Sequence, residues 1–469
     1  MYICVKYSRK KQYAMLIRFV IENLFSFGER KEFTTIPNKR LKTLEHHKYN
    51  YDDFNVLKIG SIYGANGAGK SNLIKSLELF QRLIVREEIP FRLKDSKFKF
   101  NNPKDSQDQI FAIEFIQEDI AFYYGIVLNE NSIKTEELFL SGLGKRDDKL
   151  IYERKTDKND KTSIIFLEEF ENDEKSQILK TVLLEEFVKP NEPILKLLSN
   201  RENKFLTTVK VAYKWFEDTL QIITPDSRPI ALAHKIDIDQ EFKNYAEDLL
   251  GSFNIGITEL TSEKKDLKEF FGENNKKELN GLIKKVENLP KKMIGFRSDK
   301  GNELIIVKEN GKIWVKTLKI GHVGKRDKSV LFNLDEESDG TVRLLDFVPA
   351  FNSIISNEKV FIIDEIERSI HPLLIKELVQ KFSLDPCTKG QLIFSTHESN
   401  LLDQKIFRQD EIWFTEKDKD GSTDLYSLND FKEHKTIDIQ KGYLNGRYGS
   451  IPFLGNLQDL NWHNYDTNQ

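Results

Sequence analysis

The residues with the clearest chemical potential form the loop Gly64-Ala65-Asn66-Gly67-Ala68-Gly69-Lys70-Ser71, which fits the pattern G-x-x-x-x-G-K-S. A buried strand (residues 56–63) is predicted before it and an amphipathic helix (71–84) after it. In this context the glycines let the backbone N–H groups point at phosphates, Lys70 reaches the β- and γ-phosphates and the Ser71 hydroxyl ligates Mg²⁺. The sequence therefore predicts a nucleoside-triphosphate site that extends to Asn72, and an ordinary glycine turn is the weaker interpretation.

A second group of residues lies at the end of the apolar run VFII at 360–363, where Asp364 and Glu365 follow. Beside a phosphate loop, Asp364 is expected to orient Mg²⁺ or its waters, and Glu365 to polarise the attacking water. Alone, acids at the end of a strand are common. More than half of the chain separates Lys70 from Asp364, which leaves room for a module inserted between two halves of one site.

Two shorter motifs complete the set. Ser338, Asp339 and Gly340 precede a helix-like segment, where a hydroxyl and backbone N–H groups can bind phosphate, although a simple helix cap explains the same residues. His397 ends the run Ser395-Thr396-His397 after the apolar strand QLIF. A histidine there can contact the γ-phosphate, while a lone histidine is more often an ordinary surface or core residue.

The elements that must position these residues divide the chain into four segments. Residues 1–14 read as an upstream extension, with Met15 as the expected natural start, and they lack the apolar core of a signal peptide. Residues 15–165 form an N-terminal lobe, 166–292 a helical insert, and 293–469 a C-terminal lobe. An ordered, packed segment 1–14 would count against the extension.

Apolar periodicity predicts the elements inside these segments. Short runs at 110–116, 121–128 and 135–140 favour an antiparallel sheet. Helical spacing recurs at 205–220, 242–250 and 279–289 in the insert, and strands return at 303–307 and 312–318. The buried runs at 360–364 and 391–395, separated by a helix-like segment, are typical of a parallel sheet.

Composition excludes several classes of protein. The 72 basic and 75 acidic side chains leave a net charge of −3, which argues against a uniformly basic nucleic-acid coat. Only two cysteines, Cys4 and Cys387, are present, too few for a disulfide framework, and no apolar run approaches the roughly 20 residues that span a bilayer. A cytoplasmic protein without a membrane contact is expected.

Three other patterns are interpreted as structural. The acidic run around Asp418 lacks the spacing of a calcium loop and favours a hairpin turn. The pair His46-His47 has no partner ligands at zinc spacing, so both side chains are expected in solvent. The lysines between 264 and 292 alternate with glutamates, which favours a solvated helix face over a DNA-binding surface.

Taken together, the four motifs resemble those of ABC-type ATPase heads of the RecF and SMC class. GANGAGKS resembles their Walker A motif, VFIIDEIERSIHP their Walker B and D-loop, ESDGT their signature and STH their switch histidine. The likeness extends to stand-alone AAA-family ATPases of bacterial defence islands, the RloA- or AbiL-like group, which are related to OLD-type systems and to the ATPase subunit of PARIS-type systems. It spans about 15–453 and includes the late box Gly442–Pro452, for which the sequence suggests no physical role.

The resemblance implies an α/β fold: an ABC-type P-loop ATPase head with a mixed sheet, an antiparallel β subdomain and an α-helical insert. It implies ATP and Mg²⁺ as ligands, with Lys70, Glu365 and His397 catalytic and Ser71 and Asp364 at the metal. Such heads dimerise head to tail or form higher oligomers, so Ser338, Asp339 and Gly340 would act in trans on the partner's ATP. It also implies a sensor or scaffold that controls a separate effector in antiphage defence, for example a TOPRIM-type nuclease.

This sequence departs from that pattern in some respects. The signature lacks the LSGGQ wording, and the Q-loop glutamine is open between Gln107, Gln109 and Gln117. No sustained heptads predict a coiled-coil arm. A RecF-like DNA-repair ATPase remains the alternative function, although the charge does not favour DNA binding. A nucleotide clamp that hydrolyses ATP slowly and a transporter ATPase are further alternatives, the last fitting the insert and the late box poorly.

Overall fold

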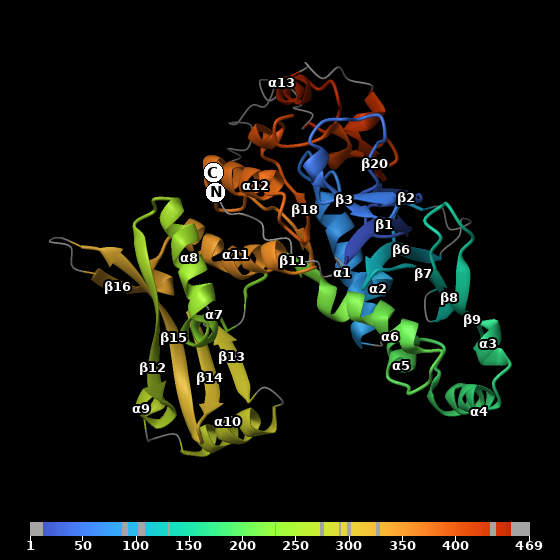
Figure 1. Cartoon of the computed structure of the whole chain (residues 1–469), viewed down its shortest axis with the longest axis horizontal. Coiled ribbons are helices and arrows are strands. Elements are labelled where there is room, and N and C mark those ends of the chain that lie inside the picture. The colour runs from blue at the N-terminus through green and yellow to red at the C-terminus, as the bar shows by residue number, and fades with distance from the viewer. Residues whose placement is uncertain are drawn as a thin grey trace, which may run out of the picture. The chain divides into compact units, whose positions relative to one another are not determined.

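A computed structural model gives the fold of the chain (Figure 1). The structure describes residues 13–86, 92–101, 108–129, 132–229, 231–272, 276–289, 292–297, 302–324, 329–431 and 438–451. The chain forms two compact units. The first contains the described residues up to Ile222, together with Ile362–Glu365 and those from Gln391 onward, and the second contains Ile223–Phe361 and Ile366–Gly390.

The first unit contains a seven-stranded sheet in the order β10-β9-β8-β7-β6-β1-β2, in which neighbouring strands are antiparallel. Glu118 and Asp119, both with positive φ, form the two-residue turn between β6 and β7, which is the backbone form that tight hairpins favour. The predicted antiparallel sheet is therefore confirmed. Its strands are β1 (Met15–Glu22), β2 (Lys31–Thr34), β6 (Gln109–Gln117), β7 (Ile120–Leu128), β8 (Ile133–Leu140), β9 (Lys149–Thr156) and β10 (Thr162–Phe166).

A six-stranded mixed sheet has the order β11-β17-β18-β5-β19-β20. Strand β5 runs parallel to β18 and β19, and β20 is antiparallel to β19. Every residue of β5, β17 and β18 is buried, as strands covered on both faces require. The strands are β5 (Ile59–Gly64), β11 (Leu220–Ile223), β17 (Val360–Ile363), β18 (Gln391–Ser395), β19 (Ile412–Lys417) and β20 (Thr423–Ser427).

Helix α1 (Lys70–Arg86) packs against both of the larger sheets of the first unit. Its Phe80 ring lies parallel to the rings of Phe111 and Tyr124 in the antiparallel sheet, with centroids 4.9 and 5.7 Å away. One turn earlier, Leu73 and Leu77 lie among apolar side chains of β5, β17 and β18. The apolar helix face predicted from the sequence is thus buried on both sides, and it fixes the position of the loop that precedes the helix.

Shorter elements complete the first unit. The ring of Trp215, just after α6, stacks on Phe115 of the antiparallel sheet at 4.6 Å. The remaining strands are β3 (Lys48–Tyr51) and β4 (Phe54–Leu57). The remaining helices are η1 (Glu45–His47), α2 (Arg92–Asp95), α3 (Glu168–Glu171), α4 (Glu174–Val182), η2 (Leu183–Phe187), α5 (Leu195–Ser199), α6 (Thr207–Lys214), η3 (Trp215–Thr219), η7 (Ser399–Leu401), η8 (Gln409–Glu411), η9 (Leu428–Phe431) and α13 (Ile439–Leu444).

The second unit is built on an antiparallel sheet with the order β12-β15-β14-β13, and β16 also pairs with β15. Its strands are β12 (Ile257–Asp266), β13 (Met293–Arg297), β14 (Glu303–Glu309), β15 (Lys312–Val323) and β16 (Ser329–Asn333). Leu279 and Val286 of α10 pack on Ile306 and Val315 of this sheet. The helices are α7 (Leu232–Ile238), α8 (Gln240–Ser252), α9 (Leu267–Phe271), α10 (Lys276–Asn288), η6 (Leu334–Glu336), α11 (Asp339–Ser356) and α12 (Pro372–Leu384).

The insert is less helical than its sequence suggests. Helices are present where spacing predicts them, at α6, α8 and α10, but β12 was not predicted. Lys264 and Lys265 lie on this strand, where they pair with Glu309 and Glu263, so the interpretation of these two lysines as part of a helix face is wrong. Because β12 pairs along β15, segments on both sides of residue 292 form one sheet.

At the start of the chain, residues 1–12 lie outside the described residues, and the extension hypothesis stays a prediction. Tyr13 and Ala14 are packed: the Tyr13 N–H donates to Asp119 Oδ1 at 2.9 Å and Ala14 is buried. Among the helices that the structure describes, none combines the length and apolar character that a membrane crossing needs.

Candidate nucleotide-binding site

The loop after β5 has the backbone that a phosphate-binding turn needs. Gly67 and Gly69 have φ values of +78° and +116°, in a region that L side chains rarely adopt. A Cβ on Gly69 would also lie 2.4 Å from the Thr423 hydroxyl oxygen, so glycine is required there for two reasons. Helix α1 begins at Lys70, and its positive N-terminal end therefore faces the loop.

Polar side chains from segments that are distant in the sequence hold this loop in place. Thr423 Oγ1 lies 3.0 Å from the Ala68 carbonyl oxygen and 2.8 Å from Ser26 Oγ. Asn72 Nδ2 donates to Ser26 Oγ at 2.9 Å, so the Asn72 side chain holds the loop that follows β1. Sequence reasoning missed Ser26 and Thr423, because two hydroxyl residues far from any motif carry no local signal.

Lys70 is almost completely buried at the centre of the loop. Its Nζ donates to the carbonyl oxygens of Gly64 at 2.7 Å and Ala65 at 3.2 Å, and lies 3.3 Å from His397 Nδ1. The structure thus brings together Lys70 and His397, which the sequence assigned to one site. An ammonium held there by carbonyls can exchange these partners for phosphate oxygens.

Ser71 and Asp364 also converge, because Ser71 Oγ donates to Asp364 Oδ1 at 3.1 Å. A hydroxyl and a carboxylate side by side are the hard oxygen ligands that Mg²⁺ prefers in nucleotide sites. Asp364 is buried and Ser71 half-buried. The residues present therefore fit Mg²⁺, and these two side chains would hold it.

Glu365 adopts a left-handed backbone with φ of +50° directly after β17. Its N–H donates to Ser395 Oγ at 2.9 Å, and Ser395 Oγ donates to Asp364 Oδ1 at 2.5 Å. The end of β18 thus holds both acids of the predicted Walker B motif. The Glu365 side chain is partly exposed, as a group that meets a water molecule must be.

His397 is solvent-exposed two residues beyond β18. Partial desolvation and then the nearby Lys70 ammonium lower the pKa of His397, and only the Asp364 carboxylate acts in the opposite direction. The imidazole is therefore neutral near pH 7 and can donate a hydrogen bond to a phosphate from one ring nitrogen.

The predicted signature residues lie in the second unit. Ser338 is the N-cap of α11, because its Oγ accepts the Thr341 N–H at 3.2 Å. Asp339 is the first residue of that helix, and a Cβ on Gly340 would lie 2.6 Å from the Ser369 carbonyl oxygen of the predicted D-loop. The capping interpretation is thus observed within the chain, and the action of these residues in trans remains a prediction.

Two of the three candidate Q-loop glutamines are engaged in the first unit's own packing. Gln109 Nε2 donates to the Leu93 carbonyl and to Ser96 Oγ, and Gln117 accepts a hydrogen bond from Thr219 Oγ1. Gln107 lies outside the described residues. The Q-loop glutamine therefore stays unassigned.

The late box has a physical role in the structure, over its described residues. Tyr443 and Tyr448 both stack on Phe414 of β19, with ring centroids 5.8 and 5.7 Å away. The Tyr443 ring also meets Tyr63, the residue before the phosphate loop, at 6.0 Å. Ser450 Oγ donates to the Thr415 carbonyl at 2.9 Å. The box thus covers the β19 side of strand β5.

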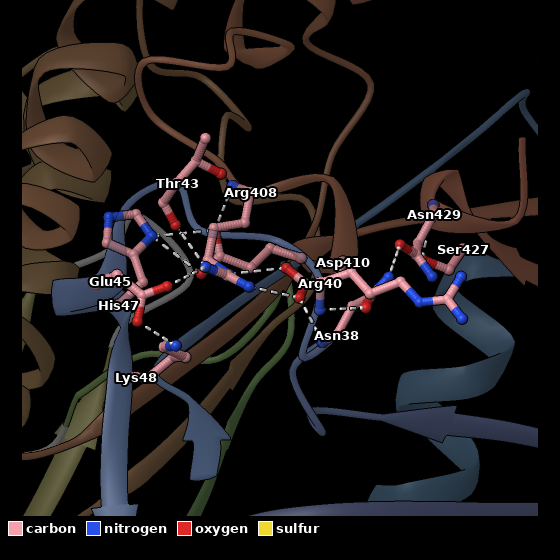
Figure 2. A network of polar contacts seen from close by, with 11 residues as sticks. Asn38, Arg40, Thr43, Glu45, His47, Lys48, Arg408, Asp410, Ser427 and Asn429 are labelled. Atoms are coloured by element: carbon pink, nitrogen blue, oxygen red, sulfur yellow. Dashed lines mark hydrogen bonds and ion pairs between the residues drawn. The ribbon is translucent and has the colours of Figure 1, made fainter. Parts of the chain in front are cut away.

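A second polar cluster of the first unit, which we call the buried cluster, consists of His47, Arg408, Asp410 and Glu411, of which Figure 2 labels the first three. His47 Nδ1 lies 2.9 Å from Glu411 Oε1, and Arg408 donates through Nε and Nη2 to the two oxygens of Asp410 at 2.9 and 2.8 Å. Burial raises the pKa of Glu411 well above its usual range. The prediction that both histidines face solvent is right for His46 and wrong for His47, which is fully buried.

Comparison with known families gives one match. Residues 61–403 match a family model described as "AAA domain, putative AbiEii toxin, Type IV TA system". The match begins on β5 before the phosphate loop and ends beyond His397, so it includes all four motifs. A search of curated protein sequences found no match to this chain.

Solved structures of SMC heads resemble the chain only distantly. A structure described as the SmcHead bound to the C-winged helix domain of ScpA is 12% identical with a TM-score of 0.39, covering 88% of this chain and 97% of that one. The SMC head domain from Thermotoga maritima is 10% identical, with a TM-score of 0.36 and coverages of 88% and 98%. A Pyrococcus furiosus Smc head with an extended coiled coil, bound to the C-terminal domain of ScpA, is 12% identical, with a TM-score of 0.37 and coverages of 93% and 99%. At these values the likeness supports no statement about function.

Proposed function

We propose that this chain, which belongs to the family of AAA domains matched by residues 61–403, binds ATP with Mg²⁺ and hydrolyses it. The observation that carries this proposal is the convergence of three segments at one point. Lys70 lies beside His397, and Ser71 beside Asp364, although the chain between these segments includes the whole second unit. Each of these groups has a distinct task in phosphoryl transfer.

The chain's own groups divide the work of hydrolysis. The loop N–H groups and the Lys70 ammonium bind the β- and γ-phosphates and favour the charge that develops on them. Glu365 orients the attacking water and accepts its proton, while neutral His397 donates a hydrogen bond to the γ-phosphate. Ser71 and Asp364 would hold Mg²⁺, which would supply positive charge to the phosphate oxygens.

A second copy of the chain completes the site in this proposal. The N-terminus of α11, with Ser338, Asp339 and Gly340, would face the γ-phosphate of the ATP bound to the other copy, in a head-to-tail dimer or a higher oligomer. The support is that these residues start an 18-residue helix whose N-terminal N–H groups and dipole suit an anion. ATP would then be the shared ligand of two subunits, and its hydrolysis would release them.

The Glu365→Gln variant tests both parts. It keeps shape and binding but cannot accept the proton, so we expect ATP turnover to fall at least ~100-fold while nucleotide affinity stays within a few-fold. Light scattering with ATP and Mg²⁺ should then show a larger, trapped species, and adding Ser338→Ala to Glu365→Gln should weaken it. Unchanged turnover in Glu365→Gln would refute the assignment of Glu365, and a monomer under all conditions would refute the trans site.

The biological role that we propose is a sensor or scaffold that controls a separate effector in antiphage defence. Its support is the sequence resemblance and the family description, which names a toxin and a toxin–antitoxin system. Co-expression with the neighbouring gene tests it: we expect a nuclease or toxin, for example of TOPRIM type, to co-purify with the chain in a nucleotide-dependent complex. A neighbouring gene that encodes neither, or salt-sensitive DNA binding without such a partner, would favour the RecF-like alternative.

A further inference from the structure

Ser395 occupies a special position between the two predicted Walker B acids. It is fully buried at the last position of β18, with Asp364 and Glu365 at the end of the neighbouring strand β17. Its single hydroxyl donates to Asp364 Oδ1 at 2.5 Å and accepts the Glu365 N–H at 2.9 Å. One side chain therefore fixes the carboxylate of one acid and the backbone of the next.

The hydrogen bond to Ser395 matters because of the backbone conformation of Glu365. A residue with a Cβ is strained in the left-handed region, and it stays there only where its surroundings hold it. The Glu365 N–H donates a hydrogen bond to Ser395 Oγ. Loss of that acceptor would let Glu365 relax towards ordinary backbone geometry and redirect its side chain.

The Ser395 hydroxyl also holds the Asp364 carboxylate. Asp364 Oδ1 accepts hydrogen bonds from two hydroxyls, Ser71 at 3.1 Å and Ser395 at 2.5 Å. The Ser71 hydroxyl is the one that would turn to a bound Mg²⁺, whereas Ser395, buried on the neighbouring strand β18, would keep its contact. Groups that orient a ligand in this way commonly change metal affinity 10–100-fold when they are removed.

From this geometry we propose that Ser395 is a positioning residue that holds Asp364 ready for Mg²⁺ and Glu365 ready for water. This inference rests on the proposed function for its catalytic consequence, and on the structure alone for its effect on the Glu365 backbone. His397 follows two residues beyond the end of β18, where its Nδ1 lies 3.3 Å from Lys70 Nζ. The end of β18 and the two residues after it thus position three groups of the site, namely Asp364, Glu365 and His397.

The variant Ser395→Ala tests the proposal, with Ser61→Ala as the matched control. Ser61 is a fully buried serine on the adjacent strand β5, and its hydroxyl bonds a backbone carbonyl, that of Glu411. In Ser395→Ala we expect kcat to fall about 10–100-fold and the Mg²⁺ concentration for half-maximal binding of a fluorescent ATP analogue to rise about tenfold. KM and binding of the analogue in EDTA should change less than about threefold.

Ser395→Thr and Ser395→Cys sharpen the test. Threonine keeps the hydroxyl, so it should recover most of kcat and of the Mg²⁺ response, whereas cysteine, a weak donor, should not. Equal losses in Ser395→Ala and Ser61→Ala, or an equal loss of binding with and without Mg²⁺, would overturn the proposal in favour of a merely structural serine.

A final readout needs no nucleotide. Hydrogen exchange of the amide of Glu365, measured on peptides that cover 362–368, should become faster in Ser395→Ala, because its acceptor is gone, and stay unchanged in Ser61→Ala. If the wild-type chain bound no nucleotide, the proposed function would fail and this exchange would still decide the backbone part. An equally slow Glu365 amide in Ser395→Ala would contradict the inference outright.

Discussion

Two polar clusters of the first unit contain similar side chains and differ in how their charges are satisfied. In the loop cluster, which consists of Lys70, His397 and the carbonyl groups of Gly64 and Ala65, the Lys70 ammonium donates to the two carbonyl oxygens and lies 3.3 Å from His397 Nδ1. In the buried cluster, Arg408 donates through two nitrogens to Asp410 (Figure 2), and His47 lies against Glu411. Each cluster joins segments that lie far apart in the chain.

The difference indicates what each cluster is for. Backbone carbonyls can give up an ammonium to the phosphate oxygens of a ligand, and Asn66 and Gly67 beside Lys70 are exposed. In the buried cluster, Arg408 is paired with Asp410 and all four side chains are buried, so the cluster fastens η1 to η8. The two clusters thus differ in access to solvent, because residues beside Lys70 are exposed and the buried cluster is enclosed.

The largest effect that separates the clusters is expected in Arg408→Met. The change leaves the buried Asp410 carboxylate without its guanidinium, and loss of one partner of a buried pair typically costs about 3–5 kcal/mol of unfolding free energy. Urea denaturation followed by tryptophan fluorescence measures it. The control is Arg40→Met, an exposed arginine of the same region, with a change within about 0.5 kcal/mol. The ATP affinity of folded Arg408→Met should equal that of wild type. A loss of affinity would show that the buried cluster also takes part in ATP binding.

A smaller, pH-dependent effect is expected in Glu411→Gln. Burial raises the pKa of Glu411, so the folded state keeps a proton that the unfolded state releases above about pH 4.5. Stability from this group is full at low pH and falls as pH rises, by at most about 1.4 kcal/mol per pH unit. The stability advantage of wild type over Glu411→Gln should therefore shrink from pH 5 to 8. The difference for Glu29→Gln, at an exposed glutamate, should stay flat, and a wild-type advantage that grows with pH would contradict this account.

The smallest effect concerns the contact within the loop cluster. Removing the Lys70 ammonium in Lys70→Ala removes a charge that disfavours the imidazolium, so the pKa of His397 should rise towards its ordinary value. Titration of the histidine ring protons by NMR measures this shift. Lys75→Ala, at an exposed lysine one turn further along α1, should leave the His397 resonance unchanged. An identical His397 titration in Lys70→Ala would mean that the two side chains do not meet.

The candidate site was more predictable than the elements around it. A phosphate loop is a local pattern, and the strands on either side of it are recognisable as short apolar runs, so Lys70, Ser71 and Asp364 could be grouped into one candidate site from the sequence. Strand β12 could not, because Lys264 and Lys265 on it are matched only by glutamates that pairing brings near. The burial of His47 could not be predicted either, since its partner Glu411 lies on a segment that is distant in the sequence. Ser395 lies in a recognisable motif, but its contacts with Asp364 and Glu365 join two strands that are distant in the sequence.

The account's central claim is that Lys70 binds the phosphates of ATP. Its most direct measurement is ATP binding and turnover, with Mg²⁺, by wild type, Lys70→Ala and the matched control Lys75→Ala, each verified as folded by its unfolding transition. We expect wild type and Lys75→Ala to bind and hydrolyse ATP alike, and Lys70→Ala to lose turnover by at least ~100-fold because its phosphate contact is gone. Full ATP turnover in folded Lys70→Ala would contradict the claim.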